Sequence, residues 1–308
     1  MLTAFVTHPD CLLHDMGSYH PECPQRIQAI EDQLIANGLM DFLSYVEAPV
    51  VTHEQLSRVH TQRYIEQVET SSPMQGIVHL DPDTAMNCHT LKAARRAAGA
   101  VVKAVDVVMS GEAPNAFCCV RPPGHHAESR RAMGFCFFNN IAVGAAHAMM
   151  HYGLERVAIV DFDVHHGNGT EEIFHDNPRV LMVSTFQHPF YPYSGDRPMG
   201  GNMVNVPLPA GTRGDTWREA VGHHWLPALR DFRPDLIMIS AGFDAHMEDD
   251  MASFGLMEAD YAWVTNELKA LADECAEGRI VSVLEGGYAL SALGRSVVAH
   301  LRALSGLS

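Results

Sequence analysis

The feature that most constrains the fold of this chain is a repeated alternation of short apolar runs with longer segments of helical periodicity. Most of the runs are continuously apolar, which is typical of strands buried on both faces of a sheet. Strands that alternate with helices predict a parallel sheet covered by helices on both sides. The predicted strands are Thr3–Val6, Ala116–Val120, Val157–Asp161, Val180–Ser184, Val204–Pro207, Leu236–Ser240 and Ile280–Leu284. The predicted helices lie near 24–37, 84–110, 137–152, 214–231, 257–277 and 289–304.

Length and composition narrow the class of protein. No linker, repeat or low-complexity tract divides the 308 residues, so we predict a single α/β domain over 1–308. A hydrophobic content of 47% excludes a disordered chain. The 37 acidic residues outnumber the 21 basic residues, and the net charge of -16 argues against a general nucleic-acid binder.

Location and metal chemistry are also constrained. No apolar run is long enough to span a membrane and no signal peptide is recognisable, so we expect a cytoplasmic protein without a membrane partner. The seven cysteines contain no Cys-x-x-Cys pair, which argues against a disulfide framework and against a cysteine zinc site. The 19 histidines instead direct attention to imidazole ligands and acid–base groups.

Polar residues follow four of the predicted strands at the points where these strands end. In an open parallel sheet, ligands bind outside the carboxyl ends of the strands. We therefore expect the polar side chains to gather at one edge of the sheet. The segments are Arg121–His126, Asp161–Gly169, Ala241–His246 and Glu285–Tyr288.

The spacing of Asp161, Asp163 and His165 predicts a metal site. Residues i, i+2 and i+4 of an extended segment share one face, so the three side chains can converge. Carboxylates buried side by side are costly without a cation, and Asp244 from another strand end can complete a set of two carboxylates and one imidazole. Such a set leaves a position open for water or substrate, and it tolerates Fe(II), Co(II) or Mn(II) as well as zinc.

The remaining strand ends offer acid–base and oxyanion-stabilising groups. His125 and His126 follow a stiff Pro-Pro-Gly turn, and a histidine facing a metal can take a proton from water and return it to a leaving group. Tyr288 follows the flexible pair Gly286 and Gly287, and its phenol can stabilise an oxyanion. Because no motif for a serine nucleophile, phosphate loop or His-Glu-x-x-His zinc site competes, these groups indicate a metal-dependent amidohydrolase.

Six ordered motifs resemble the histone deacetylase family, the zinc-dependent branch of the arginase/deacetylase fold. They extend through nearly the whole chain. The resemblance implies one three-layer αβα domain around a mostly parallel sheet of about eight strands, with a narrow tunnel leading to the zinc ion. The motifs are His20–Arg26, Arg121–His126, Gly134–Asn140, Asp161–Gly169, Ser240–Asp244 and Glu285–Tyr288.

The resemblance also implies a role for individual residues. One catalytic Zn²⁺ would be bound by Asp163, His165 and Asp244. His126 would act as general base and then as general acid. His125, paired with Asp161, would give electrostatic help in the transition state, and Tyr288 would polarise the acyl carbonyl. The residues that would contact the substrate in the tunnel are Gly134, Phe135, Tyr191, Gly286 and Gly287. A structural K⁺ ion would lie near Asp161, Asp163, His165 and Ser184.

Two positions refine the subgroup. Asn168 stands where class I relatives have an aspartate beside the second histidine, which resembles class II and bacterial histone deacetylase-like amidohydrolases. An uncharged partner is expected to stabilise the His126 cation less. Met251 aligns with the position where relatives specialised for acetylpolyamines carry a glutamate, and we therefore assign it to the substrate site.

Several alternatives stay open at this stage. The substrate is an N-acyl-lysine of a peptide or protein, or an acylated polyamine or another small amine, which would suit the acidic composition. An arginase-like enzyme with two metal ions would need a second cluster of ligands. A non-catalytic protein that binds acylated ligands is a further alternative, although the intact set of site residues argues against it. Formation of a homo-oligomer is also left open.

Overall fold

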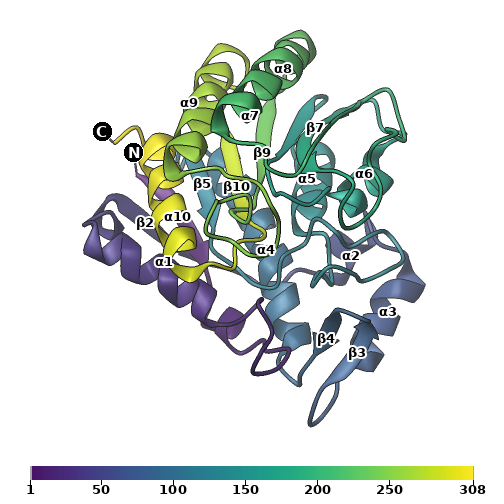
Figure 1. The fold of residues 1–308 in the computed structure, drawn as a ribbon. Coiled ribbons are helices and arrows are strands. Elements are labelled where there is room, and N and C mark those ends of the chain that lie inside the picture. The colour runs from purple at the N-terminus through teal and green to yellow at the C-terminus, as the bar shows by residue number, and fades with distance from the viewer. Residues whose placement is uncertain (1, 308) are drawn as a thin grey trace.

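The computed structural model describes residues 2–307 and contains a central eight-stranded sheet (Figure 1). Residues 1 and 308 of the predicted domain lie outside the described residues. All neighbouring strands of this sheet are parallel, in the order β2-β1-β5-β10-β9-β6-β7-β8. The strands are β1 (Thr3–Thr7), β2 (Leu43–Glu47), β5 (Asn115–Cys118), β6 (Val157–Asp161), β7 (Val180–Gln187), β8 (Met203–Leu208), β9 (Leu236–Ala241) and β10 (Ile280–Leu284).

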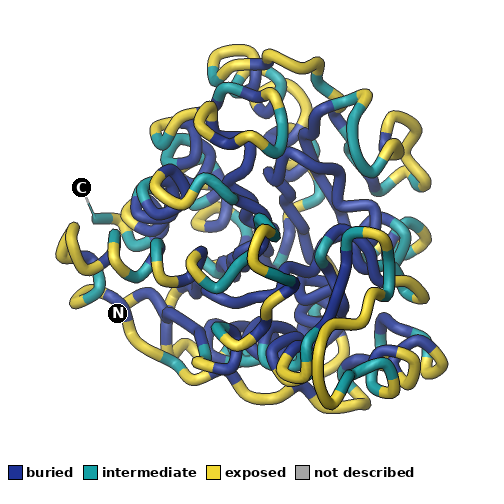
Figure 2. Tube along the Cα trace, turned by 60° about the horizontal axis from the view of Figure 1, so that its bottom comes forward, coloured by how far each residue is buried: buried dark blue, intermediate teal, exposed yellow. Residues whose placement is uncertain are grey.

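Helices cover the sheet in two separate groups. The helices α1 (Gln25–Ala36), α9 (Glu258–Cys275) and α10 (Leu290–Ser305) pack together. The second group contains α4 (Thr90–Met109) and α5 (Asn140–His151), and both groups contact the sheet (Figure 1). Every residue of β1, β5, β6, β7, β9 and β10 is buried, which confirms the expected core of continuously apolar strands. Figure 2 shows this buried interior surrounded by exposed outer turns.

The three-layer α/β prediction is confirmed, and all seven predicted strands are present within a few residues. The prediction lacked β2, the edge strand Leu43–Glu47, in which Ser44, Tyr45 and Glu47 are exposed. The remaining short elements, which were also not predicted, are η1 (Pro9–Leu12), η2 (Met40–Phe42), α2 (His53–Ser57), α3 (Gln62–Ser71), β3 (Val78–Asp81) and α6 (Asn168–Phe174).

Two predicted helices need correction. The helix predicted over 84–110 begins only at Thr90, because residues 84–86 form β4 (Thr84–Met86), which pairs with β3 in an antiparallel hairpin. The Asn87 side chain accepts a hydrogen bond from the His89 amide (3.0 Å) and separates hairpin from helix. The helix predicted over 214–231 consists of α7 (Gly214–Ala220), a π-helical turn η3 (Val221–Trp225) and α8 (Leu226–Phe232). Pro227 has no amide to donate to the preceding turn, which accounts for the irregularity.

Among the described residues, no helix is both long and apolar enough to cross a membrane.

Candidate metal centre and active site

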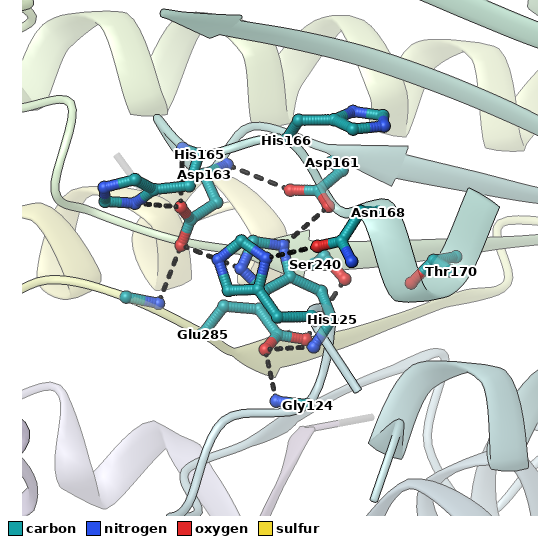
Figure 3. A network of polar contacts seen from close by, with 12 residues as sticks. Gly124, His125, Asp161, Asp163, His165, His166, Asn168, Thr170, Ser240 and Glu285 are labelled. Atoms are coloured by element: carbon teal, nitrogen blue, oxygen red, sulfur yellow. Dashed lines mark hydrogen bonds and ion pairs between the residues drawn. The ribbon is translucent and has the colours of Figure 1, made fainter. Parts of the chain in front are cut away.

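The carboxyl ends of β6, β9 and β10 bring the predicted site residues to one edge of the sheet. Asp161, the last residue of β6, lies in register with Ser240 of β9 and with Ser184 of β7. The segments that follow therefore leave the sheet side by side. Asp163 and His165 come from the segment after β6, and Asp244 from the segment after β9, as Figure 3 shows for the first two.

Asp163, His165 and Asp244 form a cluster suited to a metal ion. One ligand atom of each lies within 4.8 Å of the others, and all three residues are buried. Nδ1 of His165 is 3.1 Å from Oδ1 of Asp163 and 3.1 Å from Oδ2 of Asp244. Two carboxylates and one imidazole fit a divalent zinc ion and leave coordination positions for water or substrate. Among residues 2–307 this is the one such cluster.

The protonation of these groups reflects their crowding. Burial and the neighbouring Asp163 carboxylate raise the pKa of Asp244 to about 6. Burial disfavours the charged form of His165, but hydrogen bonds to Asp163 and Asp244 outweigh it and raise the pKa of His165 to about 10. The two carboxylates thus favour a positive charge between them, and a bound metal ion would provide that charge.

Gly286 allows the carboxylates to approach the backbone. Its amide donates a hydrogen bond to Oδ2 of Asp163 (2.8 Å). A Cβ atom at this position would lie 2.1 Å from Oδ2 of Asp244 and 2.6 Å from Oδ2 of Asp163. Glycine is therefore required here by close approach to two candidate metal ligands.

The two histidines after β5 lie in different electrostatic surroundings. Nδ1 of His125 is 2.9 Å from Oδ2 of Asp161 (Figure 3). Burial opposes a charge on His125, but the Asp161 and Asp163 carboxylates raise its pKa well above the usual value. Burial, followed by the positive charges of His125 and His165, lowers the pKa of His126 well below its usual value. These directions favour the charged form of His125 and the neutral imidazole of His126, which is the form that can accept a proton.

Asn168 orients His126. Its Oδ1 lies 2.8 Å from Nδ1 of His126, so that Nδ1 carries the hydrogen and Nε2 is the acceptor. The Asn168 amide group donates to Oε1 of Glu128 (2.8 Å), which determines which way the side-chain amide points. The predicted pairing of His126 with an uncharged partner is present in the structure.

Glu285 is a site residue that the sequence analysis did not single out. Its Oε2 accepts hydrogen bonds from the amides of Gly124 (2.7 Å) and His125 (3.1 Å), and its Oε1 accepts one from the Ser240 hydroxyl (3.1 Å). Burial raises the pKa of Glu285 to about 7. This side chain connects the end of β10 to the histidine turn, and its sequence signal is its place as the first residue of the Glu285–Tyr288 motif, directly after a buried strand.

A cavity of about 280 Å³ leads to the candidate metal ligand His165 and to His126. Tyr288 lines it, with its ring centroid 5.9 Å from that of Phe135 and 4.9 Å from the Arg26 guanidinium. Burial raises the pKa of the Tyr288 phenol well above its usual value, so the hydroxyl keeps its proton and can donate it in a hydrogen bond. The lining residues are Asp83, His126, Gly134, Phe135, His165, Phe190, Tyr191, Met251 and Tyr288.

Left-handed backbone at Gly134 and Phe135 shapes one wall of this cavity. Their φ angles are 58° and 69°, and the value at Phe135 is unusual for a residue with a side chain. The Gly134 amide donates to Oδ1 of Asp83 (3.0 Å), and the Phe135 amide donates to Oγ1 of Thr84 (3.0 Å). The hairpin of β3 and β4 thus stabilises the strained wall.

The predicted substrate residues fall into two groups, those that line the cavity and those that lie outside its lining. Gly134, Phe135, Tyr191 and Met251 line the cavity. Gly286 and Gly287 lie outside its lining; the Gly286 amide donates to the candidate metal ligand Asp163, and Gly287 directly precedes Tyr288. Two lining residues were not anticipated, Asp83 and Phe190, because each belongs to a segment without a recognisable motif.

A parallel α/β domain with a buried two-carboxylate, one-imidazole cluster beside paired histidines and a tyrosine has the groups of a metal-dependent hydrolase. A match to the histone deacetylase domain extends over residues 20–304. The chain belongs to the histone deacetylase family.

Three proteins illustrate the relationship. The histone deacetylase-like amidohydrolase of Pseudomonas aeruginosa is 37% identical, with 99% of this chain and 86% of that protein covered. The polyamine deacetylase HDAC10 of Mus musculus is 38% identical over 99% of this chain, which spans 48% of that protein. The crystal structure of the HDA15 HD domain superimposes with a TM-score of 0.93 at 36% identity, covering 100% of this chain and 91% of that one. Membership of this family supports an enzyme of the deacetylase class.

Proposed function

We propose that this protein is a zinc-dependent deacetylase that hydrolyses the acyl amide of N-acyl-lysine side chains. The observation that carries the proposal is the convergence of Asp163, His165 and Asp244 within 4.8 Å at a cavity that Tyr288 and His126 also line. Zinc bound by these three residues would supply a Lewis acid and lower the pKa of a water molecule.

The side chains of the protein account for the proton transfers. Nε2 of His126 takes a proton from the attacking water, because Nδ1 is engaged with Asn168. The water oxygen forms a bond to the acyl carbon, and the Tyr288 hydroxyl donates a hydrogen bond to the developing oxyanion. His126 then returns its proton to the amine nitrogen as the carbon–nitrogen bond breaks. The positive charge on His125, maintained by Asp161, stabilises the negative charge of the intermediate.

The shape of the cavity supports an unbranched acyl-amine as substrate. Phe135, Phe190, Tyr191 and Met251 give it largely apolar walls, which suit the four methylene groups of a lysine side chain. His126 and Tyr288 both line this cavity. A linear amide can therefore reach His126 and Tyr288 while the rest of a peptide stays outside.

The direct test uses Tyr288→Phe and His126→Ala with a fluorogenic acetyl-lysine substrate. Both variants are expected to bind one zinc ion per chain and to lose most turnover, by about 100-fold or more. Unchanged turnover in both variants would contradict the mechanism. Zinc content measured on the same samples separates loss of chemistry from loss of metal.

One observation favours acylated polyamines as a second substrate class. The Asp83 carboxylate lies among the cavity-lining residues, where it can attract a cationic chain. The net charge of -16 acts in the same direction. Comparison of kcat/KM for acetylspermidine and for an acetyl-lysine peptide distinguishes the two classes.

We also propose a structural K⁺ ion behind the metal centre. The Ser184 hydroxyl is buried without a hydrogen-bond partner among the described residues, and Ser184 lies in register with Asp161. A hard cation bound by oxygen atoms would satisfy it. A higher melting temperature in KCl than in tetramethylammonium chloride of equal concentration is the expected result, and equal values would contradict it.

A further inference from the structure

The backbone that carries Tyr288 needs restraint, because two glycines precede the tyrosine and Gly287 adopts a φ of 120°. The two glycine carbonyl groups of this loop each accept a hydrogen bond. The Arg26 Nε donates to the Gly287 carbonyl (2.6 Å), and the Phe243 amide donates to the Gly286 carbonyl (3.0 Å). These bonds leave the amides of Tyr288 and Ala289 to be satisfied by another group.

The Asp249 carboxylate provides that group. Its Oδ2 accepts hydrogen bonds from the amides of Tyr288 (2.7 Å) and Ala289 (2.9 Å). Its Oδ1 accepts one from the amide of Met251 (3.0 Å). Asp249 is only 5% exposed, and its own amide donates to the His246 carbonyl (2.9 Å), so the side chain has a defined position.

This carboxylate also occupies the amino-terminal end of a helix. Helix α10 begins at Leu290, and the residue before it, Ala289, has no side chain that can cap the helix. Asp249 supplies the missing acceptor from a distant loop, and its charge is favourable at a helix N-terminus. The same side chain therefore connects the start of α10, Tyr288 and the cavity residue Met251.

We propose that Asp249 is a positioning residue for the reaction, which holds the Tyr288 backbone so that the phenol stays directed into the cavity. The inference rests on the proposed function, because it needs Tyr288 to act on the acyl carbonyl. It extends that function to a residue that touches neither the substrate nor the candidate metal ligands by a hydrogen bond. Without Asp249, the amides of Tyr288 and Ala289 lose their acceptor and the glycine turn gains freedom.

The test compares Asp249→Asn with Asp250→Asn. The first substitution keeps the size of the side chain but replaces one acceptor oxygen with an NH₂ group, so at least one of the three hydrogen bonds is lost. Asp250 is its exposed neighbour, and Asp250→Asn makes the same change of charge without removing the acceptor of the Tyr288 and Ala289 amides. We expect Asp249→Asn to lower kcat by about 10- to 100-fold, with KM and zinc content nearly unchanged. Asp250→Asn is expected to retain wild-type kcat.

A double-mutant cycle with Tyr288→Phe separates positioning from a general structural role. If Asp249 acts through the phenol, Asp249→Asn causes little further loss in the Tyr288→Phe background. A full additional loss there, or an unchanged kcat in the single variant, would overturn the proposal. Asp249→Glu, which keeps the charge but displaces the carboxylate, repeats the cycle if the asparagine variant does not fold.

Amide hydrogen exchange provides a readout that does not depend on turnover. Exchange at Tyr288 and Ala289 is expected to be faster in Asp249→Asn than in Asp250→Asn, with other segments unchanged. Equal protection in the two variants would contradict the proposed restraint. A wild-type protein that hydrolyses no acyl substrate would overturn the proposed function instead, whatever the exchange result.

Discussion

The substitution Gly286→Ala tests the construction of the metal centre without altering any candidate ligand. The added methyl carbon would lie 2.1 Å from Oδ2 of Asp244 and 2.6 Å from Oδ2 of Asp163. Because carbon–oxygen contacts in proteins begin at about 3.3 Å, the Asp244 oxygen has to move by about 1.2 Å. A displacement of this size at a catalytic centre costs about 100-fold in rate, or about 2.7 kcal/mol.

Zinc affinity and kcat/KM are the quantities to measure. We expect Gly286→Ala to weaken zinc binding by about 10- to 100-fold, which is the usual effect of disturbing the groups that orient metal ligands. Gly201→Ala is the matched control, because a Cβ atom at Gly201 meets no atom within 4 Å. Wild-type zinc affinity together with wild-type kcat/KM in Gly286→Ala would refute the reasoning from close approach.

Three further predictions concern stability and specificity. Burial lowers the pKa of His300 from 6.5 to about 3, so between these pH values the unfolded chain binds more protons than the folded chain, and stability falls as the pH decreases below 6.5. The free energy of unfolding in urea should fall by about 1.6 kcal/mol from this group between pH 6.5 and 5, and His300→Asn should flatten that slope. Glu22→Gln removes the buried carboxylate that pairs with Arg26 and Arg121, and a loss of about 3–5 kcal/mol in the free energy of unfolding is expected from denaturant titration. Met251→Glu places a carboxylate in the cavity and should raise the kcat/KM ratio of acetylspermidine to acetyl-lysine peptide by about tenfold; a constant ratio would argue against Met251 as a specificity position.

The central strands were predictable because each one is a local apolar pattern, and the candidate site residues were predictable because each follows such a strand directly. Continuous apolar runs such as Val157–Asp161 identify buried strands, and parallel topology then brings Asp163, His165 and Asp244 to one edge. The strand Leu43–Glu47 was not predicted, because half-exposed edge strands lack the continuous apolar pattern.

Supporting contacts were less predictable because they join segments far apart in the chain. Glu285 binds the amide of Gly124 across 161 residues, and no spacing in the sequence indicates that pairing. Asp249 stands in an acidic run whose simplest interpretation is a solvated loop, yet it is the buried member of that run while Glu248 and Asp250 are exposed. Its role depends on the position of α10, which the periodicity alone does not specify.

The central claim is that one zinc ion bound by Asp163, His165 and Asp244 supports deacylation. The most direct measurement is titration of zinc into metal-free protein while acetate release from an acetyl-lysine peptide is followed. The account predicts no release without metal, an end point at one zinc ion per chain, and loss of both zinc binding and release in Asp244→Asn. Full activity in the metal-free protein, or an end point near two ions per chain, would contradict it.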